Sequence, residues 1–170
     1  MVDQALGGIW AVSIIHGGAE LLFTDESMID PKSSDQGVNG IRVVGDTLYF
    51  NNPSIGTFSR ITIDPSSGCK VGNATVISSG LEPDDFEIDE YQRFAYLTNG
   101  PKNQLLQIDL STGLYSIFAD DLPGPTTARW ISKKERGKAL YVATTGGYPG
   151  WLSGNVTLGG AIYEVSVKAY

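Results

Sequence analysis

GVNGIRVVGDTLYFNNPSIGTFSRITIDPSSG, residues Gly37–Gly68, is the most regular stretch of the chain. It holds three short apolar runs, at Ile41–Val44, Thr47–Asn51 and Thr57–Ile63, with turn-forming residues between them. Runs rich in Ile, Val, Phe, Tyr and Thr with Gly, Asp, Asn and Pro between them are typical of antiparallel strands joined by tight turns. A further run at Ala74–Ser78 completes a predicted meander of four strands.

The same pattern returns further along the chain. Three kinds of landmark recur 42 to 47 residues apart: a tyrosine within a strand (Tyr49, Tyr96, Tyr141), an aspartate after a strand (Asp64, Asp109) and a polar residue at the head of each unit (Asn39, Asp84, Thr126). A period in the low to mid forties with four strands per unit is typical of β-propeller blades. The alternative is a β-sandwich with coincidentally similar hairpins, and the common phase of three landmarks argues against it.

The sequence therefore predicts an all-β chain that forms one partial β-propeller domain over residues 1–170, with about three to four four-stranded antiparallel blades. No convincing amphipathic helix interrupts the pattern, and the polar stretch Thr24–Gly37 is predicted to be a loop. The predicted blades are an incomplete one at 1–24, complete ones at 38–79 and 83–119, and an incomplete one at 124–170.

The predicted arc of strands does not close on itself. A propeller protects its edges by closing a ring, so an open arc exposes the faces of its first and last blades. We therefore expect a homo-oligomer, or contact with another chain, that completes the open propeller; the alternative is that the chain is a fragment of a larger propeller. The apolar residues expected on the open faces are Ile9, Trp10, Val12, Ile162, Tyr163 and Val165.

Composition narrows the classes of partner. The 170 residues include 21 Gly and 8 Pro and carry a net charge of −7, which argues against nucleic acid as a partner because no basic patch faces the phosphates. No segment resembles a signal peptide, and no apolar run is long enough to span a membrane. Two N-glycosylation sequons, at Asn73 and Asn155, fit a secreted parent protein, and the compartment is left open.

Single residues exclude two kinds of chemistry. Cys69 is the only cysteine, so no internal disulfide and no cysteine-based zinc site can form. His16 is the only histidine, and we predict that it lies exposed in a hairpin turn rather than in a catalytic triad.

With these features in place, the chain resembles the senescence marker protein/gluconolactonase family, in particular its fungal type. The residues that carry the resemblance are GVNGI…LYFNN…GTFSRITID, then PDDFEID…AYLTN…NQLLQIDLSTG, then GPTTARW…LYVATTGG…GGAIYEVSV. The resemblance covers essentially all 170 residues and implies the C-terminal half of a six-bladed propeller. The first two blades and part of the third would then be missing, and the chain would be truncated relative to the family.

The resemblance also implies a site. Asn39 matches the asparagine of the family's NG motif, a metal ligand, and Asp84 matches the aspartate of its PDG-type motif, a metal ligand and the general base. Asp85 stands where the family has glycine, and we place Asp85 and Thr126 in the substrate pocket. The implied cofactor is a divalent cation, calcium first, with magnesium or zinc as alternatives. The family's glutamate ligand and second asparagine ligand would belong to the missing blades.

Two classes of function stay open. The first is metal-dependent hydrolysis, or cyclisation, of a small lactone or ester-type metabolite by a lactonase-type enzyme once the ring is complete. The second is a non-catalytic β-propeller module for binding or interaction, or an inactive fragment of a larger propeller. In the second case Asn39 and Asp84 would cap the turns that lead into the blades, as Asn and Asp readily do.

Overall fold

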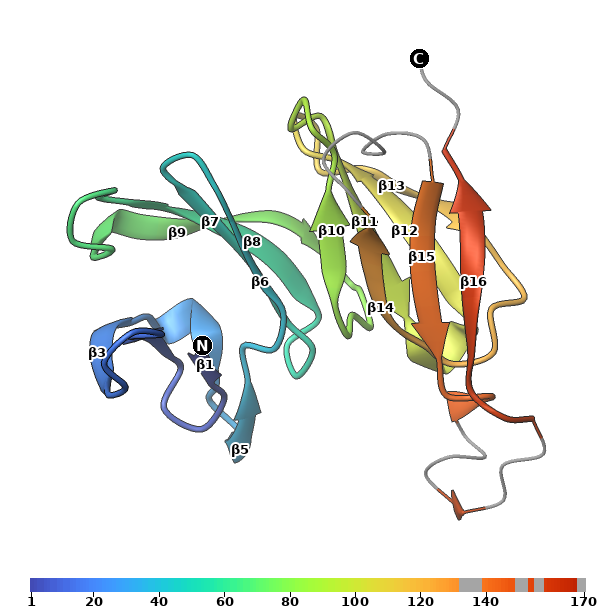
Figure 1. The fold of residues 1–170 in the computed structure, drawn as a ribbon, viewed down its shortest axis with the longest axis horizontal. Coiled ribbons are helices and arrows are strands. Elements are labelled where there is room, and N and C mark those ends of the chain that lie inside the picture. Colours follow the sequence, from blue (N-terminus) through green and yellow to red (C-terminus); the bar gives the residue numbers. More distant parts are fainter. Residues whose placement is uncertain (132–138, 149–152, 155–157, 168–170) are drawn as a thin grey trace. The chain divides into compact units, whose positions relative to one another are not determined.

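A computed structural model describes residues 1–131, 139–148, 153–154 and 158–167 (Figure 1). The chain is nearly all β, and its antiparallel sheets form a partial β-propeller, which confirms the predicted fold class. The chain divides into two compact units, Met1–Leu81 and Glu82–Tyr170. None of the helices within the described ranges is long and apolar enough to cross a membrane.

The first sheet of the N-terminal unit has three strands rather than the two expected. They are β1 (Val2–Asp3), β2 (Gly8–Val12) and β3 (Ala19–Thr24), paired in that order. The hairpin between β2 and β3 carries His16, which is exposed as predicted. The sequence does not predict the short strand β1, because two residues are too few to show an alternation of apolar and polar side chains.

The prediction of a loop from Thr24 to Gly37 is wrong. A 3-10 turn, η1 (Glu26–Met28), is followed there by a two-stranded sheet of β4 (Ile29–Asp30) and β5 (Ser33–Gly37). Burial rather than local propensity explains why this segment is structured, because Met28 is fully buried in the core of this unit.

The first complete blade follows the predicted meander. Its strands are β6 (Ile41–Val44), β7 (Thr47–Asn52), β8 (Thr57–Ile63) and β9 (Lys70–Ser79), which pair in sequence order. Strand β9 is longer than the predicted Ala74–Ser78 because it contains a bulge. Thr62 pairs with Val71 and Arg60 with Thr75, so residues 72–74 lie opposite Ile61 alone.

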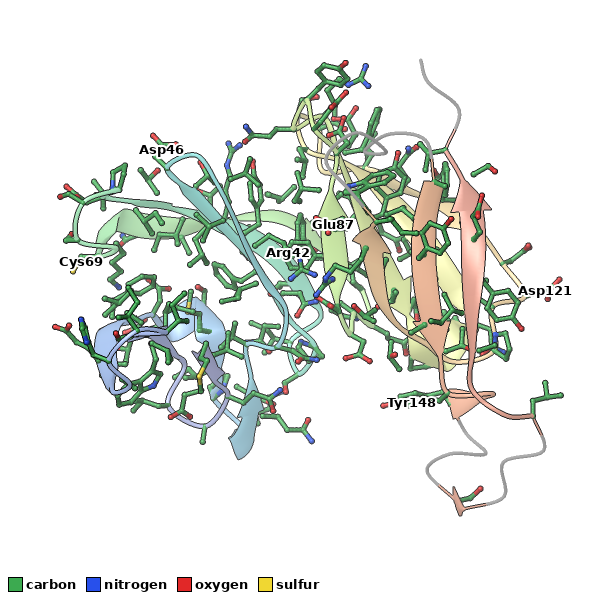
Figure 2. The ribbon with its side chains drawn as sticks, in the orientation of Figure 1. Arg42, Asp46, Cys69, Glu87, Asp121 and Tyr148 are labelled. Atoms are coloured by element: carbon green, nitrogen blue, oxygen red, sulfur yellow. The ribbon has the colours of Figure 1, made fainter. Side chains whose placement is uncertain are left out.

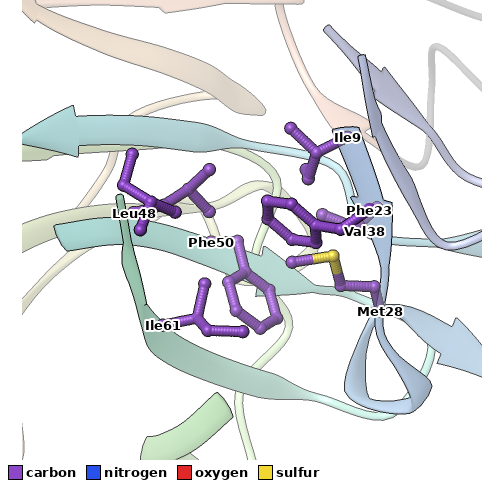
Figure 3. Close-up of a cluster of buried hydrophobic side chains, with 8 residues drawn as sticks. Ile9, Phe23, Met28, Val38, Leu48, Phe50 and Ile61 are labelled. Atoms are coloured by element: carbon purple, nitrogen blue, oxygen red, sulfur yellow. The ribbon is translucent and has the colours of Figure 1, made fainter. Parts of the chain in front are cut away.

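The core of the N-terminal unit joins its two larger sheets (Figure 3). Ile9 is only 3% exposed and packs in this core, so the expectation that it lies on an open face is wrong. The reason is that β2 turns this side chain toward the blade formed by β6–β9. The buried members of the core are Ile9, Phe23, Met28, Val38, Leu48, Phe50, Ile61 and Ile63.

The C-terminal unit contains the second complete blade and a three-stranded sheet. The blade consists of β10 (Phe86–Ile88), β11 (Phe94–Asn99), β12 (Gln104–Asp109) and β13 (Tyr115–Ala119), with the 3-10 turn η2 (Gly100–Lys102) between β11 and β12. The third sheet consists of β14 (Pro125–Trp130), β15 (Ala139–Thr144) and β16 (Ala161–Ser166).

The strand register confirms the repeat. In each of the three sheets the landmark tyrosine lies opposite the residue that comes three positions after the head residue, which is Asn39, Asp84 or Thr126. The pairs are Arg42↔Tyr49, Glu87↔Tyr96 and Arg129↔Tyr141. The three sheets therefore align residue by residue around these pairs, up to the register shift between Pro125 and Thr127 in the third sheet.

The core of the C-terminal unit is built around aromatic contacts. The ring of Tyr96 meets those of Trp130 and Phe118 edge-on, with centroids 5.7 and 5.1 Å apart. Trp130 Nε1 also donates to the carbonyl oxygen of Ile88 at 2.9 Å, which ties β14 to β10. On β16, Ile162 is 73% exposed, in line with the expected open face. The second sequon, at Asn155, lies outside the described residues.

Candidate functional site

The head of the first complete blade is held by a ladder of three hydrogen bonds. The backbone N–H of Asn39 donates to the Asn51 carbonyl at 3.1 Å, and the N–H of Asn51 donates to the Gly40 carbonyl at 3.2 Å. The N–H of Gly40 donates to Oδ1 of Asn51 at 2.9 Å. Asn39 thus stands just before β6 at the end of the sheet where β7 finishes.

The head of the second complete blade repeats this ladder. The N–H of Asp84 donates to the Thr98 carbonyl at 3.0 Å, and the N–H of Thr98 donates to the Asp85 carbonyl at 2.9 Å. The N–H of Asp85 donates to Oγ1 of Thr98 at 3.0 Å. Asp84 therefore occupies the position that Asn39 has in the first blade.

Thr126 occupies the corresponding position in the third sheet. It lies in a register shift between Pro125 and Thr127, and its Oγ1 is 3.3 Å from the carbonyl oxygen of Ala143, to which it donates. The three predicted head residues are thus equivalent in the fold. Their shared role as a site is a separate prediction, because Asn39 belongs to the first unit and Asp84 and Thr126 belong to the second.

The Asp85 carboxylate is held by protein donors from two strands. Its Oδ1 accepts from the backbone N–H of Phe86 at 2.8 Å. Its Oδ2 accepts from Thr127 Oγ1 at 2.6 Å and lies 2.9 Å from Arg129 Nη1 in an ion pair. With a side chain only 17% exposed, Asp85 links the head of β10 to β14.

Sequence reasoning did not find Thr127 and Arg129. A signal was present, since Thr127 lies 42 residues after Asp85, close to the spacing of the blade heads. Asp85 follows Asp84 directly, and Thr127 follows Thr126. The alignment of the head residues therefore also puts Asp85 and Thr127 at equivalent positions of neighbouring sheets. The contact brings the heads of β10 and β14 together within the C-terminal unit.

The donor atoms at the blade heads suit a hard cation. An amide oxygen at Asn39 and a carboxylate at Asp84 are the ligand types that calcium and magnesium take, although calcium binds about six to eight oxygens. Within the described ranges, no group of three or more His, Cys, Asp or Glu residues could hold a metal ion. Asn39 and Asp84 belong to different units, and neither head by itself fills a coordination sphere with the residues that the structure describes.

A hollow of about 450 Å³ lies elsewhere in the N-terminal unit, lined by Asp25, Glu26, Ser27, Lys70, Asn73 and Ala74. Lys70 Nζ is 2.9 Å from Asp25 Oδ2. Burial tends to raise the pKa of Asp25, but hydrogen bonds from Lys70 and Ser27 outweigh it, and the pKa is lowered. Lys70 and Asp25 thus pair with each other in this hollow, and none of the predicted site residues lines it.

The fold is similar to that of known propellers. Regucalcin from Agrobacterium tumefaciens, a calcium-binding protein, matches with a TM-score of 0.67 and 19% identity, over 99% of this chain and 55% of that chain. A luciferin-regenerating enzyme matches with a TM-score of 0.67 and 15% identity, over 98% of this chain and 61% of that one. The chain thus spans less than two thirds of the length of either structure.

Proteins of other kinds share the fold. A chain in a nidogen/laminin complex matches with a TM-score of 0.60 and 14% identity, over 84% of this chain and 51% of that chain. At these identities the likeness concerns the fold alone. Neither a protein-family model nor a curated protein sequence matches this chain.

Proposed function

We propose that the chain contributes to a divalent-cation-dependent site that hydrolyses a small lactone or ester-type metabolite, with Asp84 as general base. The observation that supports this proposal most is the repeated ladder at the blade heads, which gives Asn39 and Asp84 the same position in successive blades. Both carry oxygens of the type that calcium prefers. A fold neighbour is a calcium-binding regucalcin.

On this proposal Asp84 and Asn39 would hold the cation, which when bound polarises the lactone carbonyl as a Lewis acid. The Asp84 carboxylate takes a proton from water as the water oxygen bonds to the carbonyl carbon. The ring C–O bond then breaks, the proton passes to the departing oxygen, and a hydroxy acid results. The hydroxyl of Thr126 would contact the substrate. Cyclisation of a related metabolite would use the same groups in the reverse direction.

The partners Thr127 and Arg129 favour Asp84 over Asp85 as the base. Two adjacent carboxylates leave the choice open in the sequence, but Asp85 already accepts three hydrogen bonds or ion-pair contacts from Phe86, Thr127 and Arg129. Both oxygens of the Asp85 carboxylate are thus held by protein groups. Asp85 is therefore better suited to position the blade heads than to enter the substrate pocket.

We further propose that the chain corresponds to the C-terminal half of a fungal-type member of the senescence marker protein/gluconolactonase family, and that a second copy or another chain completes the ring.

A non-catalytic binding module is the second candidate function. It is favoured by the nidogen/laminin fold neighbour, since it shows the same architecture within a protein complex.

The test is to incubate the protein with a panel of small lactones, once with added calcium and once with a chelator. Hydrolysis is measured as the release of protons from the hydroxy acid that forms. We expect calcium-dependent turnover that falls about 10²- to 10⁴-fold in Asp84→Asn, because an amide cannot take the proton. Asp109→Asn is the matched control, since it makes the same charge change at the opposite end of the same sheet. Equal turnover in Asp84→Asn and the wild type would refute the role of Asp84. If the chelator leaves the stability of the folded protein unchanged and no lactone is hydrolysed, the non-catalytic binding module is favoured.

A further inference from the structure

Strand β9 is the edge of the first complete blade, and it exposes two apolar side chains. In the described part of the chain it pairs with β8 alone. The strand is ten residues long, and Val71 and Val76 are 55% and 53% exposed. Figure 2 shows Cys69, the residue directly before the strand, in the exposed turn between β8 and β9. A long edge strand with exposed apolar side chains is a template on which further chains can pair and aggregate.

Asn73 lies between these two valines, in the bulge of the strand, where residues 72–74 lie opposite Ile61 alone. Gly72, directly before it, has a φ of +79°, and a Cβ added to Gly72 would meet nothing within 4 Å. A glycine in this conformation lets a strand bulge and bend locally. The side chain of Asn73 is exposed. The bulge therefore presents this asparagine to solvent in open surroundings.

Asn73 also begins a sequence that can be modified. Residues Asn73–Thr75 have the form Asn-X-Thr of an N-glycosylation acceptor, and Thr75 is exposed like Asn73. Asn52 of the same sheet offers a contrast, because Pro53 occupies the middle position of its motif, which prevents recognition. Asn52 is also fully buried, and its amide nitrogen already donates to two carbonyls. Asn73 therefore combines the motif with the exposure that a modified asparagine needs.

The space beside Asn73 suits a sugar. Asn73 is one of the residues that line the hollow of about 450 Å³ in the N-terminal unit. Glu26 and the ion pair of Lys70 with Asp25 bring carboxylates and an ammonium group to the same hollow. Sugar hydroxyls can donate to such carboxylates and accept from such an ammonium group. The first sugar on Asn73 thus has both room and hydrogen-bonding partners next to its linkage.

We propose that Asn73 carries an N-linked glycan when the chain passes through a eukaryotic secretory pathway, and that this glycan covers the apolar edge formed by β9. The donor is a lipid-linked oligosaccharide. The amide nitrogen of Asn73 bonds to the anomeric carbon of the first sugar and releases one proton. The bond from that carbon to the lipid pyrophosphate breaks, and the pyrophosphate leaves with its electron pair. The inference is independent of the proposed hydrolysis, because Asn73 lies on the edge strand and not at a blade head.

The experiment expresses the full chain behind a cleavable secretion signal in yeast and analyses both the medium and the cell extract by mass spectrometry. Every protein carries Asn155→Gln, so that Asn73 belongs to the only remaining sequon. We expect this reference protein to carry a glycan that PNGase F, an amidase specific for N-glycans, removes. Asn73→Gln and Thr75→Ala should lose the glycan, whereas Thr75→Ser keeps the hydroxyl and should retain the glycan.

Aggregation, followed by light scattering, tests whether the glycan covers the edge. The reference protein should aggregate several-fold faster after PNGase F treatment, because Val71 and Val76 are then uncovered. Val71→Lys together with Val76→Lys should remove this difference, since charges on an edge strand oppose pairing. The treatment acts on folded protein, so the test does not require Asn73→Gln to fold. A reference protein without a glycan, or equal aggregation with and without the glycan, would overturn the inference.

Discussion

The first and second complete blades share a backbone but use the ends of their strands differently. At the head of the first blade, Gly40 has no side chain and Asn52 is tied to Ser27 and Ile29. At the head of the second blade, the same two positions hold the Asp85 carboxylate and the Asn99 amide, whose oxygen accepts from no donor among the residues that the structure describes. At the first head the Asn52 side chain holds neighbouring turns, whereas at the second head the Asp85 side chain ties β10 to β14.

The opposite ends of the two blades are nearly identical. Oδ1 of Asp64 accepts from the N–H groups of Ser66 and Ser67 at 2.8 and 3.0 Å. Oδ1 of Asp109 accepts from the N–H groups of Ser111 and Thr112 at the same distances. The turns at these opposite ends therefore match, whereas the residues compared at the heads differ.

The largest effect on stability is expected away from the heads. Phe50 is fully buried in the core of the N-terminal unit (Figure 3), and Phe50→Ala should lower the free energy of unfolding by about 3–5 kcal/mol through lost burial and a cavity. Urea unfolding followed by circular dichroism measures it. Val43→Ala, at an exposed position of β6, should change the free energy by less than about 0.5 kcal/mol. Equal effects would refute the assigned core.

The second prediction tests the blade heads directly. Asn52→Leu leaves the Ser27 and Ile29 carbonyls without a donor and should cost about 1–3 kcal/mol of unfolding free energy. The equivalent change Asn99→Leu should cost nothing or should stabilise the protein, because it removes a buried oxygen that no described residue pairs. Thermal unfolding of both variants side by side measures the contrast. Similar losses in the two variants would remove the distinction between the heads.

A smaller effect is expected at the Asp85–Arg129 pair. Arg129→Met should lower the free energy of unfolding by about 1 kcal/mol, because the arginine is half exposed and water screens the pair. In the double variant with Asp85→Asn the loss should be less than the sum of the two single losses, since the residues contact each other. Strict additivity would mean that the pair does not link β10 to β14.

The smallest effect concerns the matched turns. Hydrogen bonds from the Ser66 and Ser111 hydroxyls, followed by those from backbone N–H groups, lower the pKa values of Asp64 and Asp109 below the usual 3.8. A lowered pKa in the folded state contributes stability above pH 3.8, which is lost as the pH falls through the folded value. The Tm difference between wild type and Asp109→Ala should therefore shrink between pH 7 and pH 2. Asp64→Ala should behave alike, and a pH-independent difference in either would contradict the equivalence of the turns.

The repeat was readable from the sequence because its signals are local. Alternating apolar residues, glycine turns and landmarks such as Tyr49 and Tyr96 fix strands and register without knowledge of the rest of the chain. The sheet of β4 and β5 was not readable, because its polar sequence shows no alternation and its order depends on the burial of Met28. The pattern of apolar and polar residues within a short segment does not show which side chains the rest of the fold will bury.

The candidate site was predictable in part for the same reason. The equivalence of Asn39, Asp84 and Thr126 followed from their spacing, and the register bears it out. The partners of Asp85 lie in a neighbouring sheet, so a single strand pattern could not reveal that its carboxylate is already engaged. That no described residue donates to the Asn99 amide oxygen follows only from the folded arrangement of the strands.

The most direct test of the proposed cation site is a calorimetric titration of calcium into the wild type, Asp84→Asn and Asp109→Asn. We predict saturable binding to the wild type and to Asp109→Asn, and a loss of at least about tenfold in affinity in Asp84→Asn, since a carboxylate ligand becomes a neutral amide. Equal calcium binding by all three proteins, or no binding by the wild type, would contradict a cation site at Asp84.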